Sequence, residues 1–141
     1  MELEVGPFDP ALHVRSRDHY EAVRREAQLL ELQPDAPPHR FEELLARLSQ
    51  EFPPDPVDPI VDRAYLAGQP TFTARVHIPD ELVPAALAAC DDVEQLLEDL
   101  ERWAGDADLA ILEPPPEVKA YRTAYLAQVR GQLRQALPTA S

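Results

Sequence analysis

The sequence predicts a small α/β domain, with a helix-rich α+β arrangement as the alternative, built from about three short strands and about four or five helices. Two patterns predict the sheet: apolar and polar residues alternate over Thr71–Ile78, and a short apolar run follows at Leu109–Leu112. Several amphipathic stretches predict the helices. A strand, a long helix and a second strand over Thr71–Leu112 predict a β-α-β unit, which normally forms a right-handed parallel crossover.

The first part of the chain is expected to begin irregularly and then to form a strand and a helix. Residues Met1–Pro10 are polar and turn-like, and the run Ala11–Arg15 is compatible with a short strand. Ser16 offers its hydroxyl as an N-cap, so a helix is predicted over Arg17–Leu32. The apolar residues of this helix are spaced as on one face: Tyr20, Val23, Ala27 and Leu30.

Prolines separate the elements in the middle of the chain. A second helix is predicted over His39–Phe52, because its apolar residues fall on one face. Pro53–Pro59 is expected to be a proline-rich loop, since the residue before each proline is kept out of the helical region. A short helix at Ile60–Leu66, ending near Gly68, precedes the strand Thr71–Ile78.

Two amphipathic helices are predicted in the rest of the chain. The longer, over Glu81–Ala104, is expected to end at Gly105, a residue that commonly terminates helices. Pro115 and Pro116 open the second, because the missing N–H of proline costs little in the first turn of a helix. Pro138–Ser141 is expected to be a frayed tail. The apolar stripe of the terminal helix comprises Val118, Tyr121, Tyr125, Val129 and Leu133.

Length and charge limit the classes of function. The 141 residues fit one domain over the whole chain, and a net charge of −13 repels polyanions, so neither nucleic acid nor a membrane is an expected partner. The chain lacks the pattern of a signal peptide, and no apolar run approaches the roughly 18 residues of a membrane span. Cys90 is the only cysteine, which fits a reducing compartment. A soluble, cytoplasmic protein is therefore expected.

The sequence contains no recognisable catalytic or metal-binding motif. Neither a phosphate-binding glycine loop nor a nucleophile elbow is present, and the histidines lack metal-ligand spacing. We interpret the histidines as structural or solvated, and Cys90 as a small core residue whose acidic neighbours disfavour a thiolate. No enzymatic activity, no metal and no cofactor is therefore expected.

Two surfaces are candidate protein interfaces. Tyr121, Arg122 and Tyr125 lie close together on the terminal helix, and aromatic residues with arginine are enriched at interfaces. Core tyrosines beside an exposed arginine are the simpler interpretation. Glu94 and Glu98 belong to an acidic face of the long helix, which is either a solvated face or a docking site for a basic partner.

Two segments together resemble a family of small uncharacterised proteins found mainly in actinobacteria. They are LHVRSRDHYEAVRREAQLLEL, Leu12–Leu32, and LEPPPEVKAYRTAYLAQVRGQL, Leu112–Leu133. The middle of the chain, with TFTARVHIPDEL and the long acidic helix, is also similar to the family, whereas the loop Pro53–Pro59 departs from it. Genes of this family often lie beside those for anti-sigma-factor kinases, STAS antagonists or serine phosphatases.

The resemblance implies a regulatory protein of sigma-factor partner-switching or stress signalling, acting through a protein partner such as a component of a sigma/anti-sigma pathway. It supplies no catalytic residues. Two alternatives stay open. One is a small-molecule sensor with an apolar pocket lined by Tyr121, Tyr125, Trp103 and Phe72. The other is a homo-oligomeric structural unit in which the long helix pairs with its copy.

Overall fold

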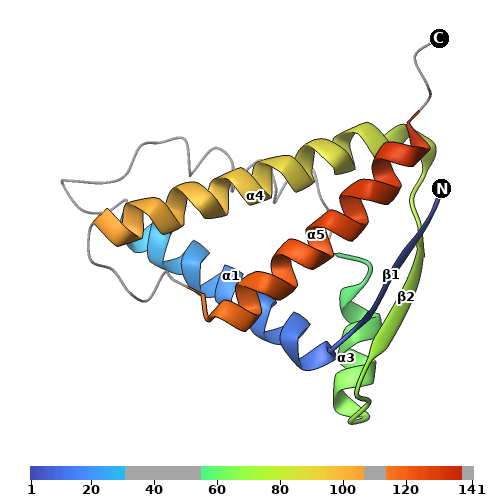
Figure 1. Ribbon diagram of the computed structural model, residues 1–141, viewed down its shortest axis with the longest axis horizontal. Coiled ribbons are helices and arrows are strands. Elements are labelled where there is room, and N and C mark those ends of the chain that lie inside the picture. The colour runs from blue at the N-terminus through green and yellow to red at the C-terminus, as the bar shows by residue number, and fades with distance from the viewer. Residues whose placement is uncertain (31–54, 107–113, 138–141) are drawn as a thin grey trace.

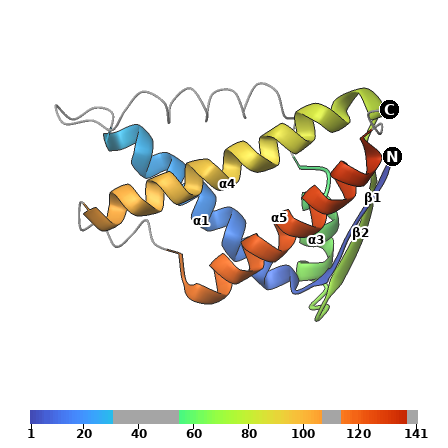
Figure 2. The same cartoon turned by 45° about the horizontal axis from the view of Figure 1, so that its top comes forward.

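The computed structural model describes residues 1–30, 55–106 and 114–137, and in these residues the fold is a mixed, helix-rich α+β arrangement. A two-stranded antiparallel sheet stands at one end, and three long helices extend from it, as Figures 1 and 2 show from two directions. The strands are β1 (Glu2–Phe8) and β2 (Phe72–His77). The helices are α1 (Pro10–Leu30), α3 (Asp58–Leu66), α4 (Val83–Asp106) and α5 (Pro116–Ala136), and a 3₁₀ turn, Asp80–Leu82, joins β2 to α4.

One face of the sheet carries the core, because side chains alternate between its two faces. The inward residues of both strands are almost fully buried and pack with side chains of α3, α4 and α5. The outward residues are polar or charged and exposed. The core includes Leu3, Val5, Phe72, Ala74 and Val76 from the strands, and Val61, Ala64, Val83, Val129 and Leu133 from the helices.

Two glutamines of α5 take the place of a third strand along the outer edge of β1. The side-chain amide of Gln132 accepts from the Glu4 N–H at 2.7 Å and donates to the Glu4 carbonyl at 2.6 Å. Gln128, one helical turn earlier, accepts from the Gly6 N–H at 2.8 Å and donates to the Gly6 carbonyl at 3.2 Å. Each amide therefore satisfies both outward backbone groups of one residue, as a neighbouring strand would.

Gly6 allows β1 to bend where its pairing with β2 becomes irregular. The register is regular from Glu2 to Val5 and shifts before Phe8, and the Gly6–Pro7 peptide bond is cis. Gly6 has φ of +113°, which other residues rarely adopt, and a Cβ at this position would overlap the carbonyl oxygen of Phe72. The backbone conformation and the close approach of Phe72 therefore require glycine at this position.

Several sequence predictions agree with these elements. The alternation predicted for Thr71–Ile78 is confirmed by the buried–exposed alternation of β2. The short helix expected at Ile60–Leu66 corresponds to α3, and the helix expected over Glu81–Ala104 corresponds to α4 and the turn before it. Pro116 begins α5, and most of the predicted stripe of that helix is buried: Val118, Tyr121, Val129 and Leu133.

Two predictions differ from the structure, and a third is not confirmed. Residues Met1–Pro10, expected to be irregular, contain β1, because Leu3 and Val5 are buried against β2. Ala11–Arg15, expected to be a strand, lies in α1. The N–H of Ala11, in the first turn of this helix, donates to the Asp9 carboxylate at 2.8 Å. β2 pairs with β1 antiparallel. The expected third strand and β-α-β unit are not confirmed, because their second strand, Leu109–Leu112, lies outside the described residues.

Other predicted segments fall outside the described residues. These are the helix His39–Phe52, the strand Leu109–Leu112, the first part of the loop Pro53–Pro59 and the tail Pro138–Ser141. Within residues 1–30, 55–106 and 114–137, no helix has both the length and the apolar character needed to cross a bilayer.

We predict that Gln128→Ala lowers the free energy of unfolding by about 1–2 kcal/mol, because it leaves two partly buried backbone groups without partners. Gln135→Ala, at an exposed position on the same helix, is the matched control. Urea denaturation followed by circular dichroism measures both. Equal stability of the two variants would show that the glutamine contacts contribute nothing to the sheet.

Candidate functional site

The candidate site is a polar cluster around His13, whose side chain lies inside the domain. His13 comes from the second turn of α1 and is only 7% exposed. The rings of Phe72, Tyr121 and Tyr125 surround it, with centroids 5.8, 5.8 and 5.3 Å from its own. Because a buried polar ring without hydrogen bonds is costly, its two nitrogens require partners.

Both nitrogens of His13 have a partner from another element. Nδ1 lies 2.6 Å from the Tyr121 hydroxyl of α5, and Nε2 lies 2.9 Å from a carboxylate oxygen of Asp58 at the start of α3. An ionised carboxylate only accepts, so we assign the Nε2 proton to this bond. In neutral His13, Nδ1 then accepts from the Tyr121 hydroxyl, and a Tyr–His–Asp chain of hydrogen bonds results.

Arg17 and Asp62 extend the cluster toward the surface. Arg17, one turn after His13 on α1, lies 3.4 Å from Asp58 and donates to Asp62 at 2.9 Å. Burial alone would raise the pKa of Asp58, but the hydrogen bond from His13, together with the charge and hydrogen bond of Arg17, outweighs it and lowers this pKa below its ordinary value. Asp58 is therefore a stable anion of the site.

Asp55 adds a second carboxylate beside the first. It precedes α3, accepts from the Val57 N–H at 2.9 Å, and accepts from the Tyr125 hydroxyl at 2.9 Å. Burial, followed by the charge of Asp55, raises the pKa values of both Tyr121 and Tyr125. Both phenols consequently remain protonated and act as hydrogen-bond donors near neutral pH.

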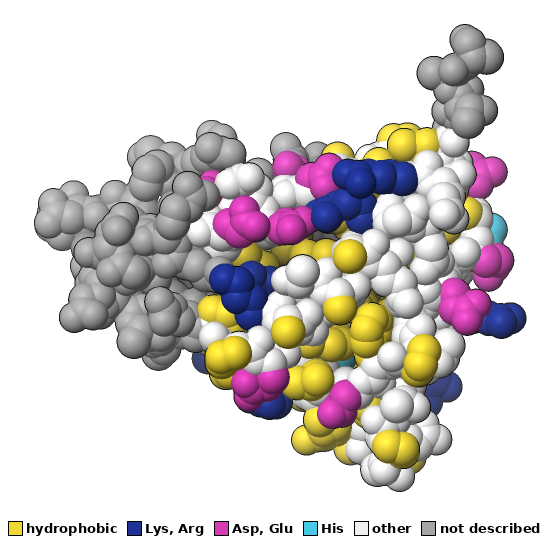
Figure 3. Space-filling view, viewed as in Figure 1, with side chains coloured by type: hydrophobic (Ala, Val, Ile, Leu, Met, Phe, Trp, Pro, Cys, Tyr) yellow, Lys and Arg dark blue, Asp and Glu magenta, His cyan; other side chains and the backbone are white. Residues whose placement is uncertain are grey.

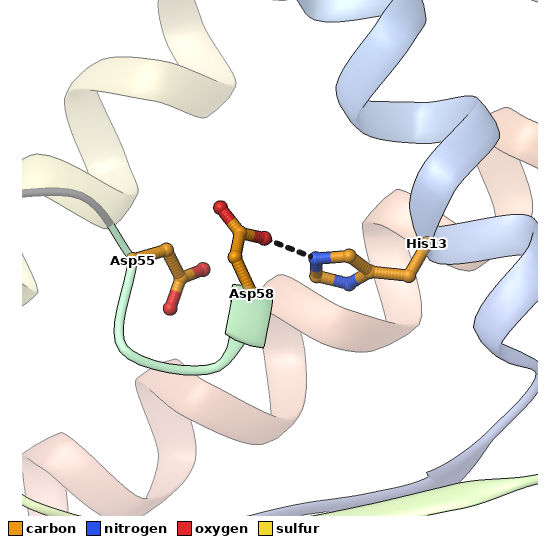
Figure 4. Close-up of side chains that lie close together, drawn as sticks. All are labelled: His13, Asp55 and Asp58. Atoms are coloured by element: carbon orange, nitrogen blue, oxygen red, sulfur yellow. Dashed lines mark hydrogen bonds and ion pairs between the residues drawn. The ribbon is translucent and has the colours of Figure 1, made fainter. Parts of the chain in front are cut away.

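Figure 4 shows His13, Asp55 and Asp58 converging from α1, from the loop before α3 and from the start of α3. One ligand atom of each lies within 4.8 Å of the others, an arrangement able to hold a metal ion. One imidazole and two carboxylates suit a divalent transition metal such as Zn²⁺ or Mn²⁺. Tyr121 is hydrogen-bonded to His13, and Tyr125 is hydrogen-bonded to Asp55. Such hydrogen bonds to the ligand side chains commonly orient them in metal sites.

The terminal-helix residues expected at an interface are largely part of this cluster. Tyr121 is 6% exposed and Tyr125 is partly buried, and their hydroxyls bond His13 and Asp55. Arg122 is partly exposed and has a partner of its own. The two tyrosines therefore present little surface to another protein in this arrangement.

The acidic residues expected at an interface lie along the seam between α4 and α5. Glu94 is ion-paired with Arg130, which also lies 2.9 Å from Asp91, while Glu98 is exposed. Figure 3 shows acidic and basic side chains next to one another along this seam. A shallow hollow of about 290 Å³ lies along the seam, lined by Asp91, Glu94, Gln95, Glu98, Arg130 and Arg134. Part of the acidic face thus faces basic residues of its own chain.

Two further sequence interpretations concern Cys90 and an apolar pocket. Cys90 is partly buried against the core, and burial raises the pKa of its thiol to about 11, so it is a thiol and not a thiolate at neutral pH. Of the residues expected to line a pocket, Tyr121, Tyr125 and Phe72 pack around His13, and the side chain of Trp103 lies outside the described part.

The outer edge of β2 is a second feature able to take part in binding. Met1 and Ile78 form a hydrogen-bonded pair, with bonds of 2.7 and 2.8 Å. Non-hydrogen-bonded and hydrogen-bonded pairs of residues therefore alternate from this pair along the antiparallel ladder. The backbone groups of Thr73, Arg75 and His77, which we call the β2 edge, therefore point away from β1. Among the described residues, none hydrogen-bonds them.

Sequence reasoning did not find His13, Asp55 and Asp58 as a group. Asp55 and Asp58 are one turn apart in sequence, but His13 precedes Asp58 by 45 residues and Tyr121 follows His13 by 108. The available signal was weak: His13 interrupts an otherwise apolar stretch, Ala11–Val14, as a buried polar residue does.

The sequence matches no protein-family model, and comparison with curated proteins and with solved structures finds no match.

We predict that the lowered pKa of Asp58 makes the cluster sensitive to acid. Because its pKa is lower in the folded than in the unfolded chain, its stabilisation is complete above the unfolded value, about 4, and is lost as pH falls through the folded value. The difference in unfolding free energy between wild type and Asp58→Asn should therefore be largest at pH 7 and shrink below pH 4. Urea denaturation from pH 7 to pH 3 measures it.

Glu21→Gln, at an exposed acid of α1, controls for the loss of a carboxylate outside the cluster. A difference between wild type and Asp58→Asn that stays constant from pH 7 to pH 3 would contradict the prediction.

Proposed function

We propose that this chain is a non-enzymatic regulatory protein that acts in the cytoplasm by binding another protein. The observation that carries the proposal is the β2 edge, whose backbone donors and acceptors have no partner in the described residues, while the opposite edge of the sheet is closed by Gln128 and Gln132. Unpaired strand edges bind extended segments of other proteins by adding a strand.

The resemblance of Leu12–Leu32 and Leu112–Leu133 to proteins encoded beside anti-sigma-factor kinases and STAS antagonists supports a place in sigma-factor partner switching or stress signalling. Such pathways work by exchange of protein partners, which is the activity that an open strand edge serves.

The state of the nucleophilic groups supports a non-enzymatic role. The Cys90 thiol, with its pKa raised to about 11, and the phenols of Tyr121 and Tyr125, with their raised pKa values, are all held protonated. Both ring nitrogens of His13 are hydrogen-bonded within the protein. In the described part of the chain, these groups serve packing and hydrogen bonding.

We predict that Arg75→Pro abolishes capture of the partner when the purified protein is used as bait in lysate of the native cell. Proline removes an outward N–H from the β2 edge and leaves the β1–β2 ladder intact, because edge strands tolerate proline at such positions. Arg75→Lys keeps both the N–H and the positive charge and should still capture the same protein. Mass spectrometry of the bound fraction measures both, and thermal melting confirms that each bait is folded.

Capture of the same protein by wild type and by Arg75→Pro, with both folded, would show that the β2 edge does not bind it. Capture of no protein by wild type would contradict the proposed function itself.

Divalent-cation binding at His13, Asp55 and Asp58 is a second candidate function. The observation that favours it is the convergence of three ligand atoms within 4.8 Å, each side chain held by a partner on its other side. The cation would replace the proton between Nε2 and Asp58. The ring proton would then sit on Nδ1 and donate to the Tyr121 oxygen, so His13 would stay fully hydrogen-bonded.

We predict that Zn²⁺ raises the melting temperature of the wild-type chain and of Glu21→Gln, but not of Asp55→Asn. The asparagine keeps one oxygen to accept from the Val57 N–H, places its NH2 group beside the Tyr125 hydroxyl oxygen, and loses the charged ligand. A bound cation at a hundred times its Kd adds about 2.7 kcal/mol to stability. Scanning fluorimetry in metal-free buffer measures the shift, and an equal shift in all three proteins would rule out this site.

A further inference from the structure

We infer that the β2 edge binds an extended, acidic segment of a partner protein, with acidic residues opposite Arg75 and His77 and an apolar side chain entering a hollow beside β2. The inference rests on the proposed function, to which it adds the chemistry of the partner. Three observations carry it: the direction of the backbone groups, the hollow, and the charge of the exposed face.

The backbone of β2 is arranged to receive one more strand. The N–H and C=O groups of Thr73, Arg75 and His77 point outward by the alternation of the ladder. On the other edge of the sheet, the outward groups of Glu4 and Gly6 bond the glutamine amides. These bonds confirm independently which residues of each strand point their backbone groups outward. A strand added at β2 therefore finds donors and acceptors at every second residue.

A hollow of about 420 Å³ lies beside the start of β2. Its walls are residues of α3, of the connection that follows α3, and of the first part of β2. No residue of β1 lines it, so it lies on the outer side of β2. Apolar side chains form much of its lining, and the rim includes a cation: Ile60, Ala64, Ala67 and Phe72, with Arg63, Gln69, Thr71 and Thr73.

The exposed face of β2 carries a cation, Arg75, and a histidine, His77, each beside a glutamate of β1, although the net charge of the whole chain is −13. Arg75 is 76% exposed and lies 3.6 Å from Glu4, a loose contact that leaves most of its donors in water. His77 accompanies it two residues later and contacts Glu2 at 2.9 Å. Charged side chains gather over the two strands in Figure 3, at the right of the view.

The inner edge of β2 already binds a segment of this chemistry. β1 reads Glu-Leu-Glu-Val over Glu2–Val5, with each glutamate opposite a basic residue of β2 and each apolar side chain in the core. Cross-strand pairs of opposite charge stabilise such a pairing. Because Arg75 and His77 stand equally close to the outer edge, the same alternation fits there.

A second copy of the chain fits the β2 edge poorly. Two β2 strands paired about a two-fold axis at Arg75 would place this residue opposite its own copy, and like charges directly opposite are destabilising. The large negative charge of each copy adds a general repulsion. An acidic segment avoids the first penalty and replaces it by attraction.

The test uses the full chain and two fluorescein-labelled peptides. One peptide repeats the Glu-Leu-Glu-Val pattern twice, and the other carries lysine in place of each glutamate. We expect the acidic peptide to bind by fluorescence anisotropy and the basic peptide to bind about tenfold more weakly. Arg75→Glu should weaken binding of the acidic peptide by about tenfold, whereas Arg25→Glu, the same charge change on an exposed residue of α1, should not.

Hydrogen exchange provides the readout specific to strand addition. The acidic peptide should protect the amides of Thr73, Arg75 and His77, which point outward, and leave those of Ala74 and Val76, already bonded to β1, unchanged. This pattern supports the inference, since a peptide bound elsewhere would not produce it.

Each other outcome overturns the inference in a distinct way. Equal affinity for both peptides, with protection at the β2 edge, would overturn the acidic chemistry and leave the proposed function standing. Dimerisation of the free chain through the β2 edge, seen by light scattering and abolished by Arg75→Pro, would replace the partner by a second copy. Binding of neither peptide would overturn the inference, and only a failed capture experiment would overturn the proposed function as well.

Discussion

The pair of hydrogen bonds made by the His13 ring fixes how α1, α3 and α5 meet. One nitrogen reaches α5 through Tyr121, and the other reaches α3 through Asp58, so three segments far apart in sequence are joined at one buried ring. Losing either contact would leave a buried polar group unsatisfied, at a cost of about 1–3 kcal/mol. The position of α5 in turn places Gln128 and Gln132 against β1, and the position of α3 places one wall of the hollow beside β2. The cluster and both sheet edges therefore depend on the same ring.

Sequence patterns predicted the elements whose signal is local. Alternation over Thr71–Ile78 and the stripe from Val118 to Leu133 identify β2 and α5, because each pattern repeats over several residues and no proline interrupts it. β1 was missed because its alternation covers only Glu2–Val5 before Gly6 and Pro7, residues typical of turns. Its pairing with a strand some seventy residues away also leaves no local trace. The start of α1 was placed too late, since five residues, Ala11–Arg15, are too few to separate a strand from a helix by period.

The candidate site was less predictable than the fold. Tyr121 and Tyr125 were identified correctly as stripe residues, but their hydroxyl partners come from α1 and from the segment before α3. A hydrogen bond between side chains depends on the tertiary arrangement, and the three residues His13, Asp58 and Tyr121 follow no common spacing in sequence. In the sequence, Asp55 and Asp58 stand out only as parts of a proline-rich segment. The acidic stripe of α4 shows the same limit, because its pairing with Arg130 depends on where α5 crosses it.

The asymmetry of the sheet has a consequence for assembly. A two-stranded sheet with two open margins could extend indefinitely, each new strand offering a fresh template to the next molecule. Here the amides of Gln128 and Gln132 occupy one margin, and as side chains they end the hydrogen-bonding pattern instead of passing it on. Whatever pairs with the other margin completes a finite complex. Under the proposed function, the chain would recruit one strand at a time and still resist the fibrous polymerisation to which exposed β-structure is prone.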